Sequence, residues 1–202
     1  MNETWPEIKK RKLKERRGET FDWIQSLVVS LLICVLLFTF VLRVINVSGT
    51  SMLDTLHDGD RILISNLFYT PRQGDVVVLQ KESFSSEPIV KRIIALEGQT
   101  VNIDFDEGVV YVDGVALDEP YAYEPTHRRI DFEDEVVVPE GCLFVLGDNR
   151  NGSTDSRDDR IGFVDSRLVM GRAFFLLIPG SDPRIGESRD WGRIGWVRGW
   201  AK

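Results

Sequence analysis

The hydrophobic positions of this chain fall into one long run near the N-terminus, followed by many short runs separated by polar turns. The long run, Leu27–Leu42, contains sixteen residues without a charge. Extended to residues 23–46, it predicts a transmembrane helix, because that length crosses about 30 Å of hydrocarbon at 1.5 Å per residue. Trp23 and Arg43 near its ends are residue types that favour the membrane interface.

A basic cluster before this helix predicts its orientation. Residues 1–22 contain seven Lys and Arg against five acidic residues. Such flanks stay in the cytoplasm, so we expect a single span in the cell membrane with the rest of the chain extracytoplasmic. A buried core helix and a cleaved signal peptide are the alternatives. Apolar residues on all sides of the run disfavour the first, and the absence of a small-x-small motif in VLRVINVSG disfavours the second.

The short apolar runs beyond the helix predict an all-β domain over residues 47–180, built as an antiparallel barrel or sandwich. Turn-forming sequences separate these runs, and Asp113-Gly114 between VVYV and VAL predicts a two-residue hairpin. Residues 121–126 are interpreted as an exposed loop. The expected strands are Arg61–Ser65, Val76–Leu79, Ile89–Ala95, Thr100–Ile103, Val109–Val112, Val136–Val138, Cys142–Leu146 and Arg172–Ile178.

The last part of the chain, residues 181–202, is rich in tryptophan and arginine. Trp191, Trp196 and Trp200 alternate with basic residues there. Tryptophan next to cations is typical of a lipid headgroup interface, and a disordered tail is the alternative.

Charge and cysteine content narrow the possible partners. The net charge is −7, and since residues 1–22 contribute +2, the rest of the chain carries −9. A nucleic-acid-binding surface is basic, so no nucleic-acid partner is expected. Cys34 and Cys142 are too few for a disulfide framework or a zinc site, and no cofactor or metal is expected.

Two segments contain residues suited to nucleophilic catalysis. Ser51 lies in a turn of small residues, which exposes its hydroxyl and leaves backbone N–H groups available for an oxyanion. Lys91 interrupts an apolar strand, with Ile89 and Ile93 on its own face. If burial lowers the pKa of this lysine to about 8, roughly a tenth of the amine is neutral at pH 7 and able to act as a base. The alternative is an edge lysine that prevents aggregation.

A third segment, GDNRNGSTDSR at residues 147–157, alternates hydroxyl, acidic and arginine side chains. Such a loop orients other groups through hydrogen bonds and Asp–Arg pairs. A calcium loop is the alternative, although the interleaved arginines and the lack of EF-hand spacing disfavour it. A Ser–His–Asp site is a further alternative, but His57 and His127 are interpreted as exposed loop residues.

Together, SMLDTL at 51–56, VKRIIALEGQTV at 90–101 and GDNRNGSTDSR at 147–157 resemble the signature blocks of bacterial type I signal peptidases. The resemblance covers residues 24–180, and the apolar helix precedes the first block as in that family. It implies a serine endopeptidase with Ser51 as nucleophile and Lys91 as general base. Ser153 would hydrogen-bond the lysine amine, and Asp155, Arg157 and Arg92 would form a supporting polar network.

The same resemblance implies the substrates and their binding site. The substrates are exported pre-proteins, cleaved after their signal peptides beside the bilayer. Pockets for small side chains before the scissile bond would be lined by Ile45, Val47, Met52, Leu56 and Val90. A catalytically degenerate, membrane-tethered β-domain that binds export partners and a soluble Ser–Lys repressor relative are the alternatives.

Two positions depart from the family pattern. Gly49 stands where some members have a second oxyanion donor, a side-chain hydroxyl. Asp54 stands where proline is usual, three residues after Ser51. A carboxylate facing Lys91 raises the lysine pKa and weakens the base, so we expect Asp54 to face away from Lys91.

Overall fold

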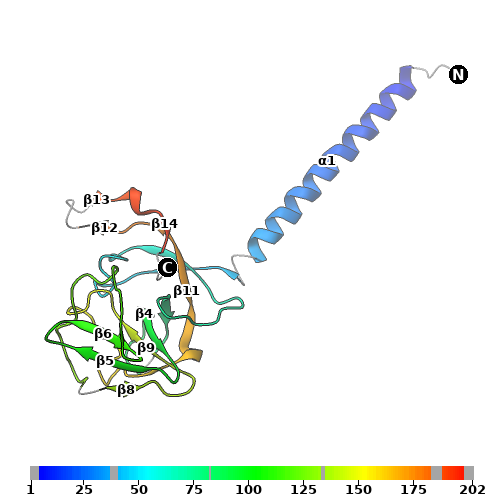
Figure 1. The fold of residues 1–202 in the computed structure, drawn as a ribbon. Coiled ribbons are helices and arrows are strands. Elements are labelled where there is room, and N and C mark those ends of the chain that lie inside the picture. The colour runs from blue at the N-terminus through cyan, green and yellow to red at the C-terminus, as the bar shows by residue number, and fades with distance from the viewer. Residues whose placement is uncertain (1–4, 37–40, 82, 133–134, 183–187, 198–202) are drawn as a thin grey trace. The chain divides into compact units, whose positions relative to one another are not determined.

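The computed structural model describes residues 5–36, 41–81, 83–132, 135–182 and 188–197. The chain divides into two compact units, residues 1–41 and residues 42–202, and each is described by itself. In the first unit, helix α1 (Trp5–Leu36) continues through the basic segment into the apolar run (Figure 1). Lys, Arg and Glu are good helix formers, which accounts for the early start of the helix.

The helix predicted over residues 23–46 differs from the observed one at its C-terminal end. Residues 37–40 lie outside the described part of the chain, and Arg43–Asn46 form strand β1. The β-branched Val44 and Ile45 favour a strand, and β1 pairs with β2 (Arg61–Ser65) along its whole length. Among the residues described, no helix combines the length and the hydropathy that a bilayer span requires.

The second unit is mostly β, with a curled antiparallel main sheet (Figure 1), which confirms the prediction of a β-rich antiparallel domain. The strand order is β1-β2-β11-β3-β4-β9-β10, and β14 also pairs with β11. The remaining strands of this sheet are β3 (Val76–Leu79), β4 (Ile89–Leu96), β9 (Cys142–Leu146), β10 (Val164–Asp165), β11 (Val169–Ile178) and β14 (Gly195–Trp196).

A smaller sheet is inserted between β4 and β9. Its order is β7-β6-β5-β8, formed by β5 (Thr100–Asp104), β6 (Val109–Val112), β7 (Val115–Ala116) and β8 (Val136–Val137). The predicted hairpin at Asp113-Gly114 is confirmed, because it joins β6 to β7 and both turn residues have the positive φ that this turn requires. Strands β4 and β9 pair directly with each other, so the chain leaves and re-enters the main sheet at neighbouring positions.

Part of the segment expected as a tail belongs to the β unit. Strands β12 (Ser181–Asp182) and β13 (Ser188–Arg189) pair with each other, and a 3₁₀ turn, η4 (Trp191–Arg193), precedes β14. Trp196 packs edge-on against Phe175 of β11, with ring centroids 5.5 Å apart. Apolar contacts with β11 therefore favour order at residues 195–196, whereas Trp200 lies outside the described residues.

The apolar core forms three clusters. One, which we call the nucleophile cluster, packs the turn around Ser51 against the main sheet. Its buried members are Val47, Met52, Leu56, Ile62, Ile64, Val76, Val78, Val90, Ala173 and Leu176. A second joins the inserted sheet to β4 and β9, and a third lies among β3, β4, β9 and β10. The turn containing Ser51 is therefore fixed by burial of its own Met52 and Leu56.

Candidate active site

Ser51 lies in a turn that is held at both ends by hydrogen bonds. Before it, the Val47 N–H donates to Asp60 O at 2.7 Å, and after it the Leu56 N–H donates to Met52 O at 2.8 Å. The 147–157 loop fixes the middle, because the Asn149 N–H donates to Ser51 O at 3.0 Å and its side-chain amide to Thr50 O at 3.0 Å. The first and third sequence blocks are thus joined directly at the nucleophile candidate.

Lys91 extends from β4 to the Ser51 hydroxyl. Its Nζ lies 2.8 Å from Ser51 Oγ, within hydrogen-bond distance. The lysine is only 4% exposed, and this desolvation lowers its pKa to about 8. The nearby Asp155 and Asp148 oppose the shift and Arg157 adds to it, but burial is the largest cause. A serine hydroxyl beside a lysine with this pKa is the arrangement that nucleophilic catalysis requires.

Arg92, the residue after Lys91, forms a buried ion pair with Asp148. Its Nε lies 2.8 Å from Oδ1 and its Nη2 2.6 Å from Oδ2. It also donates to Gly74 O at 2.8 Å, and the Thr55 hydroxyl contacts both Arg92 and Asp148. Both charged side chains are fully buried, so removing either one would leave the other as an unpaired buried charge.

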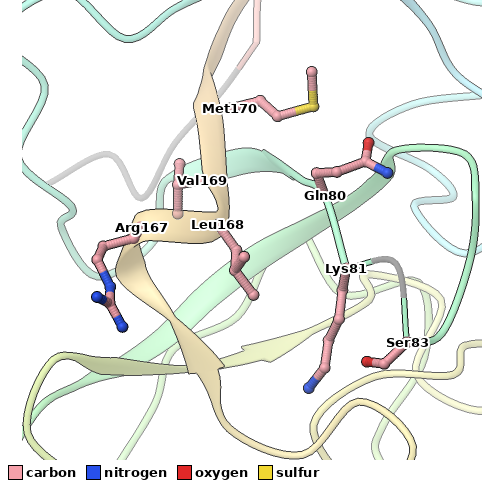
Figure 2. A pocket seen from close by; sticks show the side chains of 7 residues that line it. All are labelled: Gln80, Lys81, Ser83, Arg167, Leu168, Val169 and Met170. Carbon is pink, nitrogen blue, oxygen red and sulfur yellow. The ribbon is translucent and has the colours of Figure 1, made fainter.

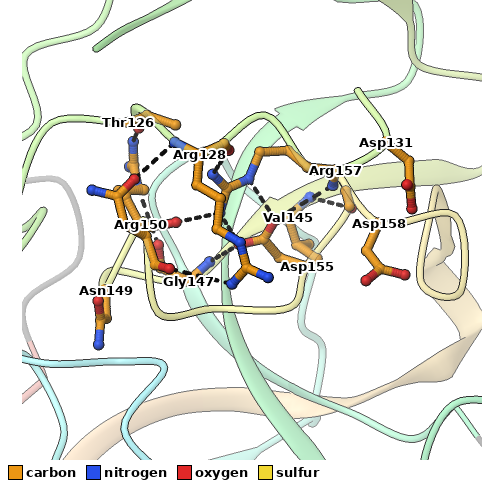
Figure 3. Close-up of polar contacts among 12 residues, drawn as sticks. Thr126, Arg128, Asp131, Val145, Gly147, Asn149, Arg150, Asp155, Arg157 and Asp158 are labelled. Atoms are coloured by element: carbon orange, nitrogen blue, oxygen red, sulfur yellow. Dashed lines mark hydrogen bonds and ion pairs between the residues drawn. The ribbon is translucent and has the colours of Figure 1, made fainter. Parts of the chain in front are cut away.

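Asp155 and Arg157 form a second buried pair (Figure 3). Two guanidinium nitrogens of Arg157 contact the two Asp155 oxygens at 2.8 and 2.9 Å. Asp155 also accepts from the Gly147 N–H at 3.0 Å, and Arg157 donates to the carbonyls of Arg128 and Arg150. Asp155, Arg157 and Arg92 were expected to form one polar network. In the structure they belong to two ion pairs, Arg92 with Asp148 and Arg157 with Asp155, and both aspartates lie in the 147–157 loop.

Ser153 is buried, but the expected hydrogen bond to Lys91 is not formed. Its hydroxyl has no hydrogen-bond partner among the described residues. The side chain packs instead against Gly147, where an added Cβ would collide with Ser153 Oγ and lie 2.5 Å from Ser51 O. Glycine at 147 is what allows the Ser51 and Ser153 segments to approach this closely.

A third polar group was missed by sequence reasoning, which placed Tyr121 in an exposed loop. The Arg92 guanidinium lies over the Tyr121 ring, 3.9 Å from its centroid. The Tyr121 hydroxyl donates to Glu119 at 2.9 Å, and Glu119 forms a two-pronged pair with the buried Arg150. Burial raises the pKa of Tyr121 well above its ordinary value, so the phenol keeps its proton. In the sequence, the one indication of this contact with Arg92 was an aromatic residue directly after Glu119 and Pro120.

The residues expected to line the substrate pockets share one location. Val47, Met52, Leu56 and Val90 are buried members of the nucleophile cluster, and Ile45 packs against it. They form a continuous apolar layer beneath the turn that contains Ser51. The structure brings these five side chains together, although they come from distant segments.

Asp54 does not act on the lysine. Its carboxylate lies 4.0 Å from His57 Nε2 and is 55% exposed, and Asp54 is not among the charges that shift the Lys91 pKa. His57 is buried rather than exposed as expected. Its backbone N–H donates to Oδ2 of the buried Asp60. The calcium loop considered as an alternative would use Asp148, Asp155, Asp158 and Asp159. The first three of these are paired with Arg92, Arg157 and Arg160.

A pocket between the end of β3 and the start of β11 contains none of the expected site residues (Figure 2). Its two cations are already engaged, since Lys81 donates to Ile161 O and Arg167 pairs with Asp165 at 2.5 Å. Burial lowers the pKa of Lys81, as it does for Lys91, but the pocket lining offers it no acid or histidine partner. Ser83 also lines this pocket, but among the described residues Lys81 bonds the carbonyls of Ile161 and Phe163 and not Ser83, so the Ser–Lys contact found at Ser51 is not repeated here.

Comparison with known proteins identifies the family of this chain. The sequence model of the family "Signal peptidase, peptidase S26" matches residues 20–178. A probable signal peptidase I-1 of Synechocystis sp. is 36% identical over 182 residues, covering 85% of each chain. Signal peptidase I of Bacillus licheniformis is 32% identical over 184 residues, covering 86% of this chain and 96% of its own.

A crystal structure of a signal peptidase I from Enterococcus faecalis V583 is 30% identical to this chain. It covers 52% of this chain and 97% of its own, with a TM-score of 0.42. None of these relatives supports the alternative of a degenerate binding domain. The three sequence blocks at residues 51–56, 90–101 and 147–157 lie inside the matched region, and the chain belongs to the signal peptidase family, peptidase S26.

Proposed function

We propose that Ser51 and Lys91 are the catalytic dyad with which this serine peptidase removes signal peptides from exported precursors. The single observation that carries the proposal is the 2.8 Å approach of a buried lysine amine to the Ser51 hydroxyl. With a pKa of about 8, roughly a tenth of this amine is neutral at pH 7. An ordinary lysine would supply only about 0.04%.

The reaction is an acyl transfer through a covalent intermediate. Neutral Lys91 accepts the Ser51 proton while Ser51 Oγ attacks the scissile carbonyl. The resulting lysinium gives that proton to the leaving amine, and the carbon–nitrogen bond breaks. Lys91 then accepts a proton from water while the water oxygen attacks the acyl carbon. The bond from that carbon to Ser51 Oγ breaks, the lysinium returns the proton to Oγ, and the signal peptide leaves with a C-terminal carboxylate.

The backbone N–H of Ser51 is the first donor to the developing oxyanion. No other described residue accepts a hydrogen bond from it. Gly49 supplies no hydroxyl as second donor, and its own N–H is used by Asp58 at 2.7 Å. Removing one oxyanion donor costs about 3–4 kcal/mol in other enzymes, so a second donor from Ser48 or Thr50 is part of this proposal.

The supporting residues hold the dyad rather than react. The Arg92–Asp148 pair follows Lys91 directly, and Asp155 fixes the Gly147 backbone beside Ser51. Ser153 packs against Gly147, and its buried hydroxyl, which has no partner among the described residues, is proposed to hydrogen-bond the lysine amine only once substrate is bound. Ile45, Val47, Met52, Leu56 and Val90 form the apolar floor that accepts small side chains before the scissile bond.

The chain is further proposed to be anchored in the cell membrane through the apolar run that ends before strand β1, residues 23–42, with its N-terminus cytoplasmic. Support comes from the charge-free run Leu27–Leu42 and the basic cluster that precedes it. Anchoring raises the local concentration of precursors that are held in the same bilayer. Such an enzyme cleaves tethered precursors faster than soluble peptides of the same sequence.

Two substitutions test the dyad. Ser51→Ala and Lys91→Met should each lower cleavage of a labelled precursor at least 1,000-fold, since a lone member of such a unit contributes little. Lys81→Met is the matched control, because Lys81 is also a partly buried lysine with a lowered pKa but contacts only carbonyl groups. Near-normal cleavage by Ser51→Ala, or an equal loss in Lys81→Met, would contradict the assignment.

A further inference from the structure

A groove of about 840 Å³ borders the turn that follows Ser51. This volume lies within the usual range of about 300–1,000 Å³ for ligand sites. Three segments that are distant in sequence form its walls. They include Asp54 and Thr55 after the nucleophile, Asp118 and Tyr123 after β7, and Arg193 and Trp196 near the C-terminus.

The groove is connected to the dyad by hydrogen bonds. Thr55, four residues after Ser51, donates to Asp148 and receives a bond from Arg92, the neighbour of Lys91. Among the residues proposed to bind the substrate before the scissile bond, only Leu56 lines the groove. Leu56 therefore joins the proposed apolar floor to the groove, and a substrate that extends past Ser51 is within reach of both.

The charges around the groove favour a cationic ligand. Asp54 and Asp118 are both exposed on its lining. Arg193 also lines it, but its guanidinium contacts both oxygens of the buried Asp60 at 3.0 and 2.7 Å. Its charge is thus balanced from outside the groove, and the two aspartates give the lining an acidic character.

Aromatic side chains complete the site. Tyr123 is 51% exposed and Trp196 75% exposed, and both line the groove. Aromatic faces accept the methylene stem and the cation of a lysine or arginine side chain. Carboxylates on the rim then meet its charged end.

The C-terminal wall of the groove lies beyond the region that the family model matches. Gly192–Val197 lie outside the matched region, residues 20–178. The wall is nevertheless built into the β unit, because Leu176 pairs with Gly195 and Arg193 is anchored on Asp60. The C-terminal wall is therefore a fixed part of the β unit.

We propose that this groove binds the first residues after the scissile bond, and that Asp54 and Asp118 favour basic over acidic side chains there. The inference rests on the proposed peptidase function and adds a preference on the mature side of the cleavage site. Exposed charge pairs contribute up to about fivefold each. Two carboxylates should therefore give about a tenfold preference.

The test uses the full-length protein in detergent and three precursors that differ only at the first two positions after the scissile bond. These positions hold Lys, Gln or Glu, and kcat/KM is measured for each precursor. The wild type should prefer Lys over Glu about tenfold. Asp118→Asn should reduce this ratio to about threefold, and Asp54→Asn with Asp118→Asn should bring it near one. Asp106→Asn, which removes an exposed carboxylate from the inserted sheet, should leave the ratio unchanged.

The outcomes separate the groove from the dyad. Equal cleavage of the Lys and Glu precursors by the wild type, or a ratio that persists in the double variant, overturns the groove assignment and leaves the peptidase function intact. Absence of cleavage of the Gln precursor by the wild type overturns the function itself. If the double variant does not fold, the wild-type ratio is measured against salt, since 1 M salt screens exposed charges and should abolish the preference.

Discussion

At the scale of single residues, the base depends on how the surrounding charges are paired. Asp148 and Asp155 lie near enough to Lys91 to raise its pKa. Each is held by its own arginine, so neither stabilises the lysinium fully, and desolvation prevails. The folded pKa of about 8 lies below the unfolded value near 10.4, so the charged lysine opposes folding below pH 8. This penalty of about 3 kcal/mol disappears as the pH rises from 8 to 10.4.

The same pKa predicts the pH dependence of activity. Because the reaction needs the neutral amine, kcat/KM should rise about tenfold per pH unit from pH 6 to about 8 and then level off. Stopped assays with one precursor across this range measure it. Lys91→Arg should be inactive throughout, since a guanidinium keeps its proton. A flat profile between pH 6 and 8 would show that Lys91 is not the base.

At the scale of elements, the C-terminal segment is attached to the β unit through a buried carboxylate, that of Asp60. Asp60 receives hydrogen bonds from the His57 and Gly180 N–H groups and from the Arg193 side chain. A single buried carboxylate thus joins the turn after Ser51, the chain after β11 and the segment that contains η4. Two interactions hold residues 191–197 on the β unit. They are the ion pair between Arg193 and Asp60 and the edge-on contact of Trp196 with Phe175.

Removing Arg193 should therefore be costly. Arg193→Ala leaves the buried Asp60 without its cation and should lower the free energy of unfolding by about 3 kcal/mol. Arg167→Ala is the matched control, because the Arg167–Asp165 pair is exposed to solvent and its loss should leave the free energy of unfolding nearly unchanged. Denaturant unfolding of both variants checks the difference. Equal losses would mean that Arg193 is not a structural anchor.

Most strands were predictable because their apolar runs are long enough to show a pattern. The exceptions are elements that depend on a partner. Strand β1 lies in the continuation of an apolar helix, and only its pairing with β2 identifies it as a strand. Strand β14 has only two residues, and only its pairing with β11 identifies it as a strand. The dyad was predicted from three blocks, whereas the Tyr121 contact with Arg92 joins segments that no local pattern relates.

At the scale of the whole molecule, the β unit contains all the proposed catalytic and substrate-binding residues. It begins at Leu42, one residue before β1, and its described part has its own buried core. A chain of residues 42–202 should therefore fold alone and cleave a soluble peptide with kcat/KM within about fivefold of the full-length protein. Its advantage on membrane-tethered precursors should be lost. Loss of soluble-peptide cleavage in a folded truncated chain would show that residues 1–41 contribute to the site.

The inserted sheet has a consequence for how such enzymes diversify. Leu96 and Leu143 face each other across β4 and β9, so everything between them forms an excursion with adjacent ends. Lengthening such an excursion costs little entropy, about 0.6 kcal/mol per doubling. Relatives can gain or lose strands there, or accept a grafted module, without disturbing the register of Lys91, provided that a Tyr121-like side chain still returns to cover Arg92.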